Sequence, residues 1–349
     1  MADKNKDTIG VLLLNLGGPD SLQAVKPFLY NLFSDREIIR LGPSFMQKPI
    51  AWLISTVRSP KTHQMYSLIG DKSPIFDITK AQAELLEKTL NAEVKRIRSL
   101  EDKNFSISQP LNFLSSQPHF KVYIGMRYWH PFIKDTVDKI LKDDIKHLIV
   151  LSLYPHYSRA TTGSAISEFK RVITQFPVLS SQFSVKYIEQ WYDFSPYIDA
   201  LTELIIRGIS EFSTDILYSA HSLPEYLIRT GDPYLDHIKA TITAVNLLLA
   251  TRYSLLPKWH LSFQSKTGPV KWLKPTTEET IIRLASEGCK NLFVVPISFV
   301  SDHIETLYEI DILYKGIAEK HGINFKRCEA LNTSEKFIKA LEELVMRGI

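Results

Sequence analysis

The chain has 349 residues, of which 44% are hydrophobic and 23% charged, so it is long enough for two compact lobes and too apolar for a disordered or fibrous protein. Its formal net charge of +4 comes from Lys and Arg scattered among similar numbers of Asp and Glu, which disfavours nucleic-acid binding. Two cysteines, Cys289 and Cys328, make no disulfide framework and indicate a reducing compartment.

The first residues, MADKNKDTIG, are polar and contain no apolar signal core. No later stretch reaches the roughly 18 consecutive apolar residues of a membrane-spanning helix. We therefore expect a cytoplasmic location, with contact to a membrane surface left open.

Eight short apolar runs, separated by longer helical patterns, predict parallel strands joined by helical crossovers. They are residues 9–15, 120–125, 147–153, 183–189, 215–220, 260–265, 291–297 and 324–330. We predict an α/β fold of two Rossmann-like lobes, each with a four-stranded parallel sheet flanked by helices, and a cleft between the lobes.

The aromatic stretch at 190–199 is the expected crossing between the lobes. This places the first lobe at 8–190 and the second at 191–349. The C-terminal helix, 333–347, is a candidate for packing back on the first lobe.

Two stretches of the first lobe do not fit a bare α/β unit. Residues 39–62 mix apolar side chains with Lys and Arg, which suits a hydrophobic lip on the cleft or an interfacial anchor. Residues 95–118 are polar and Ser-rich, and we interpret them as a surface insertion.

In parallel α/β sheets, ligands bind beyond the carboxyl ends of the strands. Three expected strand ends carry a histidine, namely His156, His221 and His303. The turn after the first strand holds Gly17 and Gly18 but lacks the third glycine of a dinucleotide fingerprint, which disfavours nucleotide binding. A lone histidine is more often structural than catalytic, so the segment around His221 leaves both roles open.

One segment gathers an imidazole and several carboxylates directly after a buried strand: Asp302, His303, Glu305 and Glu309. At about 100° per residue, Asp302, Glu305 and Glu309 share one helical stripe, and no Lys or Arg on that stripe balances them. The pattern fits a divalent cation site and a solvated helix face about equally well. The sequence does not decide between an α-helix and a wider π-turn.

Six segments, in order and over nearly the whole chain, resemble the ferrochelatase family. They are LLLNLGGPDSLQAVKPFLYNLFSD, GMRYWHPFI, YPHYSRATTGS, YSAHSLPEYLIRTGDPY, FQSKTGPVKWLKPTTEETI and VVPISFVSDHIETLYEIDI. The resemblance implies two Rossmann-like lobes around a porphyrin cleft. It also implies insertion of Fe²⁺ into protoporphyrin IX with release of two protons, the last step of haem biosynthesis.

The resemblance further implies residue roles. His221 would be the central catalytic residue, as a base for pyrrole protons or as an iron ligand, with Glu305 across the cleft. The expected path for metal or protons comprises His221, Glu305, Asp302, His303 and Glu309. The expected porphyrin contacts are Arg127, Tyr128, Ser73, Ile39, Tyr157, Trp272 and Phe299, and 39–62 would be the lip through which porphyrin passes to or from a membrane.

Departures from the family pattern refine these expectations. Arg159 stands where cluster-bearing members have a cysteine, so we expect no [2Fe-2S] cluster and no other cofactor, Fe²⁺ being a substrate. Leu16 stands where the coproporphyrin-using branch generally has Tyr, which favours protoporphyrin. Two alternatives stay open: a chelatase of the same fold for coproporphyrin or another tetrapyrrole, and a non-catalytic haem-binding protein.

Overall fold

A computed structural model describes residues 8–101, 118–143, 145–176, 184–209, 215–266 and 270–349. Its strands form two four-stranded sheets in which every pairing is parallel. The first sheet has the order β2-β1-β3-β4, from β1 (Thr8–Asn15), β2 (His119–Met126), β3 (His147–Ser152) and β4 (Ser184–Ile188). The second has the order β6-β5-β7-β8, from β5 (Asp215–His221), β6 (Trp259–Gln264), β7 (Asn291–Pro296) and β8 (Asn324–Arg327). The predicted fold class is confirmed, although the last strand ends earlier than expected.

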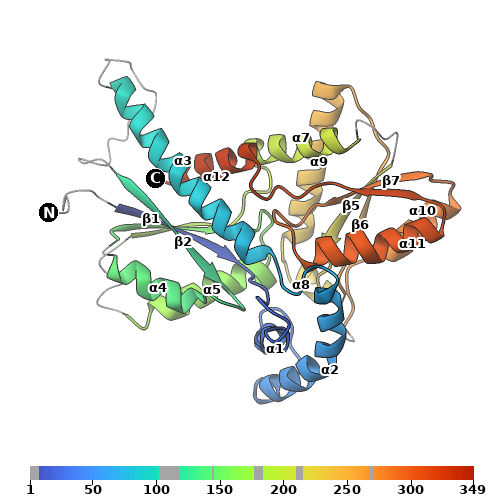
Figure 1. Ribbon diagram of the computed structural model, residues 1–349, viewed down its shortest axis with the longest axis horizontal. Coiled ribbons are helices and arrows are strands. Elements are labelled where there is room, and N and C mark those ends of the chain that lie inside the picture. Colours follow the sequence, from blue (N-terminus) through green and yellow to red (C-terminus); the bar gives the residue numbers. More distant parts are fainter. Residues whose placement is uncertain (1–7, 102–117, 144, 177–183, 210–214, 267–269) are drawn as a thin grey trace.

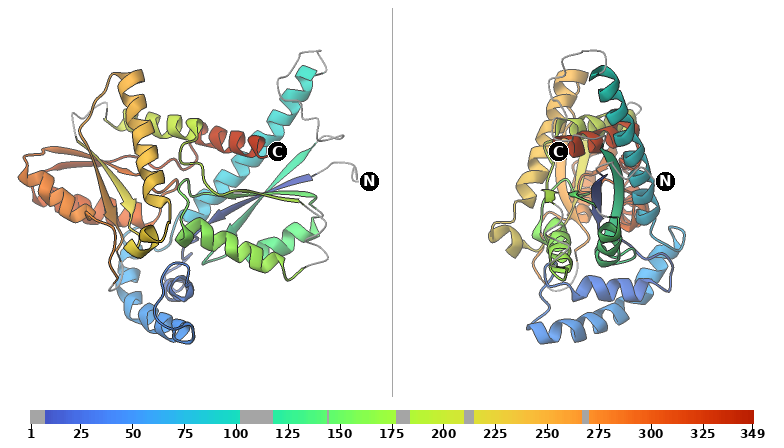
Figure 2. Two further views of the ribbon diagram at one scale, coloured as in Figure 1. Left: turned by 180° about the vertical axis from the view of Figure 1, so that it is seen from behind. Right: turned by 90° about the vertical axis from the view of Figure 1, so that its left-hand side faces the viewer.

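Each sheet is covered by helices on both faces (Figures 1 and 2), which is why the inner strands β1, β3 and β7 are almost continuously apolar. Along β1, Val11 and Leu13 face α3 (Ile75–Glu101), whereas Leu12 and Leu14 face α4 (Ile133–Lys142) and α5 (Ser164–Ile173). The second sheet packs on α7 (Ser195–Ile209) and α9 (Tyr234–Tyr253) with one face, and on α10 (Thr277–Ser286) and α11 (Lys315–Lys320) with the other.

A single apolar cluster runs through both lobes. It joins residues of β1 and α3 to residues of β5, α7 and α9, and α12 (Glu335–Arg347) packs against both α3 and α7 (Figures 1 and 2). Trp191 and Tyr197, from the predicted crossing, are buried in the same cluster. The two lobes therefore share a core, and the boundary at residue 190 stays a prediction.

The long connection from β1 to β2 carries α1 (Val25–Ser34), the short 3₁₀-helix η1 (Ser44–Met46) and α2 (Gln47–Ser67), which lie together at the bottom of Figure 1. The predicted lip, 39–62, falls on η1 and most of α2. Its large exposed apolar side chains are Phe45, Met46, Trp52, Leu53 and Val57. No helix in the described ranges combines the length and the hydropathy that a bilayer crossing requires.

The predicted insertion at 95–118 is only partly covered by the structure. Residues 95–101 continue α3, so this part is helical rather than irregular, and residues 102–117 lie outside the described residues. Three further short helices complete the described chain: α8 (Glu225–Arg229) and the π-helices η2 (Arg159–Gly163) and η3 (Glu305–Tyr314).

Candidate active site

One cavity lies at the point where the strand order reverses in each sheet. In sheets of this order that point is between β1 and β3, and between β5 and β7, and it is where ligands bind in open α/β sheets. Residues that end or follow these four strands line the cavity: Leu16, Gly17, Tyr154, His156, His221, Ser298 and Phe299. Apolar side chains of α1 and the segment after it close another side, among them Phe28, Leu29, Leu32, Phe33, Ile38 and Ile39.

His221 is the last residue of β5, and its backbone is held from two sides. Its N–H donates to Ser298 Oγ at 2.8 Å, and its carbonyl accepts from the Tyr234 hydroxyl at 2.9 Å. The imidazole Nδ1 lies 2.8 Å from Glu305 Oε2. The Nε2 atom makes no hydrogen bond to the residues that the structure describes, so this end of the ring is available to a bound molecule.

Glu305 begins the π-helix η3, whose wider turn the sequence left undecided. The hydroxyl of Ser265 donates toward Glu305 Oε2 at 2.7 Å and also contacts Glu309 Oε2. Gln264 Nε2 adds bonds to the Glu305 carbonyl at 3.1 Å and to Glu309 Oε2 at 3.2 Å. The two carboxylates thus meet at one point, beyond the end of β6.

The charges of His221 and Glu305 depend on each other. Burial by itself would raise the pKa of Glu305, but the positive charge and hydrogen bond of His221 hold that pKa well below its usual range. Burial would likewise lower the pKa of His221, but Glu305 raises it above its ordinary value. Glu309 is partly buried beside Glu305, and desolvation together with the charge of Glu305 raises its pKa to about 7. The pairing with His221 therefore keeps Glu305 ionised near neutral pH.

Asp302 lies apart from the other predicted ligands and does not line the cavity. Its Oδ1 accepts from Arg327 Nη1 at 2.9 Å, and its Oδ2 accepts from Asn332 Nδ2 at 2.8 Å. Arg327 also donates to Asp311 at 2.8 Å. The expectation that no cation balances the carboxylates of this segment is therefore wrong for Asp302. Arg327 ends β8 and is remote in sequence, which is why the local pattern did not predict it.

His303 does line the cavity, with its ring centroid 4.2 Å from that of Phe299, and burial lowers its pKa. No group of three or more His, Cys, Asp or Glu side chains within the described ranges is arranged to hold a metal ion. The structure therefore brings His221, Glu305 and Glu309 close together, while the five predicted ligands do not form one coordination shell.

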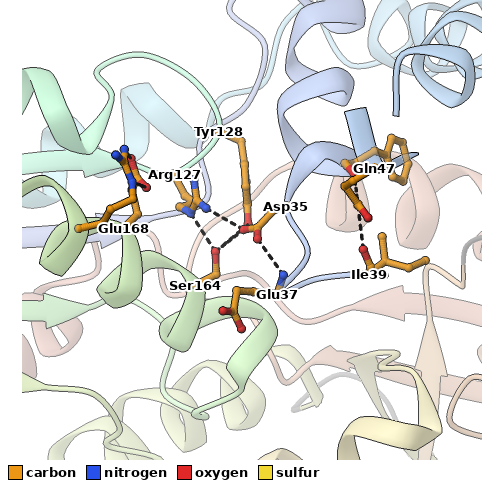
Figure 3. A network of polar contacts seen from close by, with 10 residues as sticks. Asp35, Glu37, Ile39, Gln47, Arg127, Tyr128, Ser164 and Glu168 are labelled. Atoms are coloured by element: carbon orange, nitrogen blue, oxygen red, sulfur yellow. Dashed lines mark hydrogen bonds and ion pairs between the residues drawn. The ribbon is translucent and has the colours of Figure 1, made fainter. Parts of the chain in front are cut away.

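Four of the seven predicted porphyrin contacts line the cavity: Ile39, Ser73, Trp272 and Phe299. Arg127 and Tyr128 do not, because both are bound to Asp35 (Figure 3). Tyr157 lies instead at a separate open depression, beside Tyr187 and Pro233.

The family model for ferrochelatase matches residues 8–349 of this chain. The chain belongs to the ferrochelatase family. Curated ferrochelatases of Desulfotalea psychrophila and Geotalea uraniireducens are 45% and 47% identical to it, each over 97% of both chains. That of Synechocystis sp. is 45% identical over 98% of this chain and 82% of its own length. A ferrochelatase is a lyase that inserts iron into protoporphyrin in haem biosynthesis, in agreement with the predicted activity.

The fold itself is shared more widely. The crystal structure of a sirohydrochlorin chelatase from Bacillus subtilis subspecies spizizenii, in complex with cobalt, matches with a TM-score of 0.50. The match covers 98% of this chain and 95% of the sirohydrochlorin chelatase chain. The sequences are only 10% identical, so the likeness concerns the fold alone.

Sequence reasoning missed several residues of the ferrochelatase cavity. Arg58 of α2 reaches the lining, with its guanidinium 5.5 Å from the ring of Phe33, and Lys266, which follows β6, lines the same cavity. Ser265, which bridges the two glutamates, sits in a left-handed conformation with φ of 67°. Its position as the last residue of the predicted strand 260–265 was the signal that could have identified it, because strand ends line the sites of such sheets.

Proposed function

We propose that this ferrochelatase inserts Fe²⁺ into protoporphyrin IX inside the cavity, with His221 as the base at the ring centre. The supporting observation is the 2.8 Å contact between His221 Nδ1 and Glu305 Oε2, which leaves Nε2 unpaired. With Nδ1–H donated to the carboxylate, the Nε2 lone pair is presented to the pyrrole N–H groups. Glu305 then stabilises the imidazolium that forms when a proton is taken.

The wall of the site suits a flat apolar macrocycle. Ile39, Trp272 and Phe299 supply apolar and aromatic surface, while Ser73 adds a hydroxyl. Arg58 and Lys266 are the exposed cations of the lining, and we assign to them the ion pairs with the propionate groups.

The acidic residues suit the approach of iron. Glu305, Glu309 and the imidazole of His221 offer the oxygen and nitrogen ligands that a divalent first-row metal accepts. His303 extends this polar surface, and we assign the four residues to the path of Fe²⁺ or of the released protons. We assign Asp302 a structural role outside this path, because its two carboxylate oxygens accept hydrogen bonds from Arg327 and Asn332.

Activity should fall as the pH drops through the pKa of His221, because only neutral imidazole can accept a pyrrole proton. Glu305 raises that pKa above the ordinary value of 6.5, so we expect the acid limb of kcat/KM above pH 6.5. Replacing Glu305 by Gln should move the limb to lower pH. The measurement is a pH profile of kcat/KM for wild type and Glu305→Gln, and an unmoved limb would contradict the pairing.

The function is tested by mixing purified protein with Fe²⁺ and protoporphyrin IX under anaerobic, reducing conditions and following the absorbance change on metallation. Wild type should turn over many equivalents. Tight binding of haem without turnover would support the non-catalytic alternative.

The proposed contact of 39–62 with a membrane surface rests on its exposed apolar side chains, and co-sedimentation with lipid vesicles checks it.

A further inference from the structure

The backbone of His221 lacks the strand partner that its place in the sheet would give it. In a parallel sheet, the N–H and C=O groups of alternate residues point to the same neighbouring strand. Ser219 pairs with Pro296 of β7, and its carbonyl accepts from the N–H of Ile297 at 3.1 Å. The backbone groups of His221 therefore also face β7. However, the N–H of Phe299 turns back to the carbonyl of Pro296 at 3.4 Å, so the chain bends away before it can pair with His221.

Two side-chain hydroxyls take the place of the missing strand. The N–H of His221 donates to Ser298 Oγ at 2.8 Å, and its carbonyl accepts from the Tyr234 hydroxyl at 2.9 Å. The two hydroxyl oxygens lie 2.9 Å apart. Because Tyr234 already donates its proton to the carbonyl, Ser298 must donate to Tyr234. The result is a closed hydrogen-bond ring, in which each hydroxyl donates once and accepts once.

Tyr234, which supplies one of these hydroxyls, is itself fixed in place. It is the first residue of α9, and its N–H donates to Asp232 Oδ1 at 3.1 Å. Its aromatic ring packs edge-on against that of His156, with 6.3 Å between the centroids. Tyr234 and Ser298 are only 4% and 6% exposed, so the hydrogen-bond ring is shielded from bulk water. Buried polar networks whose members are all paired make a site rigid.

The hydrogen-bond ring and Glu305 constrain different parts of His221. The contact of 2.8 Å between Nδ1 and Glu305 Oε2 sets the direction of the imidazole. The hydrogen-bond ring sets the position of the backbone that carries it. A base must lie within hydrogen-bond reach of the proton that it accepts, and a displacement of about 1 Å can lower the rate about 10²-fold. Both constraints are therefore needed to place Nε2.

We propose that Tyr234 and Ser298 are positioning residues for iron insertion, because their hydrogen-bond ring holds the backbone of His221 where Nε2 reaches the pyrrole N–H groups. This role rests on the function proposed above, in which His221 is the base. Both hydroxyl protons are engaged within the hydrogen-bond ring, which assigns them to His221 and not to a bound porphyrin.

The first test removes each hydroxyl separately. Tyr234→Phe and Ser298→Ala should each lower kcat by about 10- to 100-fold, as expected for a misplaced base. Both side chains also line the cavity, so the affinity for protoporphyrin is measured without iron by fluorescence quenching. It should stay within a few-fold of wild type. Tyr123→Phe is the matched control, because the buried Tyr123 donates to Asp143 at 2.7 Å in the first lobe, and it should keep wild-type kcat.

The second test combines the two changes. Groups that act as one unit lose most of their effect when either is removed. Tyr234→Phe/Ser298→Ala should therefore lower kcat about as much as the more severe single change. Losses that multiply in the double variant would mean that the two hydroxyls act separately, and would overturn the proposed ring.

The third test needs no turnover. Amide hydrogen exchange of the fragment 217–223 should be faster in Tyr234→Phe and Ser298→Ala than in wild type or Tyr123→Phe, because the His221 backbone is released. Unchanged exchange in both variants would overturn the hydrogen-bond ring. Faster exchange with wild-type kcat, or a loss of porphyrin affinity that accounts for the whole effect, would overturn the positioning role alone.

Thermal unfolding checks that each variant is folded, and if one single variant does not fold, the other decides. A wild-type protein without any turnover would overturn the proposed function, and the positioning role with it. The two failures are therefore told apart by the wild-type assay.

Discussion

His221→Ala is expected to lower kcat for Fe²⁺ insertion by about 10²- to 10⁴-fold, the usual contribution of a positioned general base. The change removes the unpaired Nε2 and leaves the partly buried Glu305 without its imidazole partner. Protoporphyrin should still bind, because the apolar wall from α1 and α2 is untouched. Anaerobic metallation assays give kcat, and fluorescence quenching gives the affinity for porphyrin.

His260→Ala is the matched control. His260 also pairs with a carboxylate at 2.9 Å, that of Asp215, but at the opposite end of β5. Its loss should leave kcat within a few-fold of wild type. If His221→Ala retained near wild-type turnover, or if both variants lost activity equally, His221 would not be the central base.

Asp35→Ala is expected to lower the free energy of unfolding by about 3–5 kcal/mol, the range for breaking a buried ion pair from one side. Asp35 is only 8% exposed and accepts from Arg127 at 2.9 Å and from Tyr128 at 2.6 Å, as Figure 3 shows. The hydroxyl of Ser164 bonds to the same oxygen. Without Asp35, the half-buried guanidinium and the buried phenol lose their acceptor. Urea unfolding monitored by circular dichroism measures the effect.

Asp77→Ala provides the comparison, because Asp77 forms an ion pair with Lys72 at 2.7 Å in which both side chains are more than half exposed. Exposed ion pairs contribute roughly 0–1 kcal/mol to stability, so this substitution should change the free energy of unfolding very little. Similar urea unfolding midpoints for Asp35→Ala and Asp77→Ala would mean that the hydrogen bonds of Asp35 to Arg127, Tyr128 and Ser164 do not stabilise the fold.

The sheets could be predicted from the sequence because strands that are covered on both faces are continuously apolar, as in Val11 to Leu14. The site's location followed from the same pattern, since His221 ends one such strand. Long-range partners could not be predicted in this way. Arg327 lies outside the segment of Asp302, and only the folded second sheet brings its guanidinium to that carboxylate.

Resemblance identified residue types but not the direction of every side chain. Arg127 and Tyr128 were expected at the porphyrin, and the structure turns them toward Asp35. Asp35 gave no local signal, because a single carboxylate at a helix end is ordinary in sequence. The sequence did not decide between an α-helix and a π-helix for a related reason. Apolar periodicity indicates which residues are buried, whereas i→i+5 hydrogen bonding depends on backbone geometry.

The core shared by the two lobes determines how a flat substrate can reach the cavity. Because α3, α7 and α12 bind both sheets into one body, a hinge between the lobes would have to open a continuous apolar interior. By contrast, α1 and α2 belong to a separate apolar cluster. Opening and closing for each turnover should therefore be a displacement of these two helices over a stationary frame, and the exposed apolar side chains of α2 would move with them.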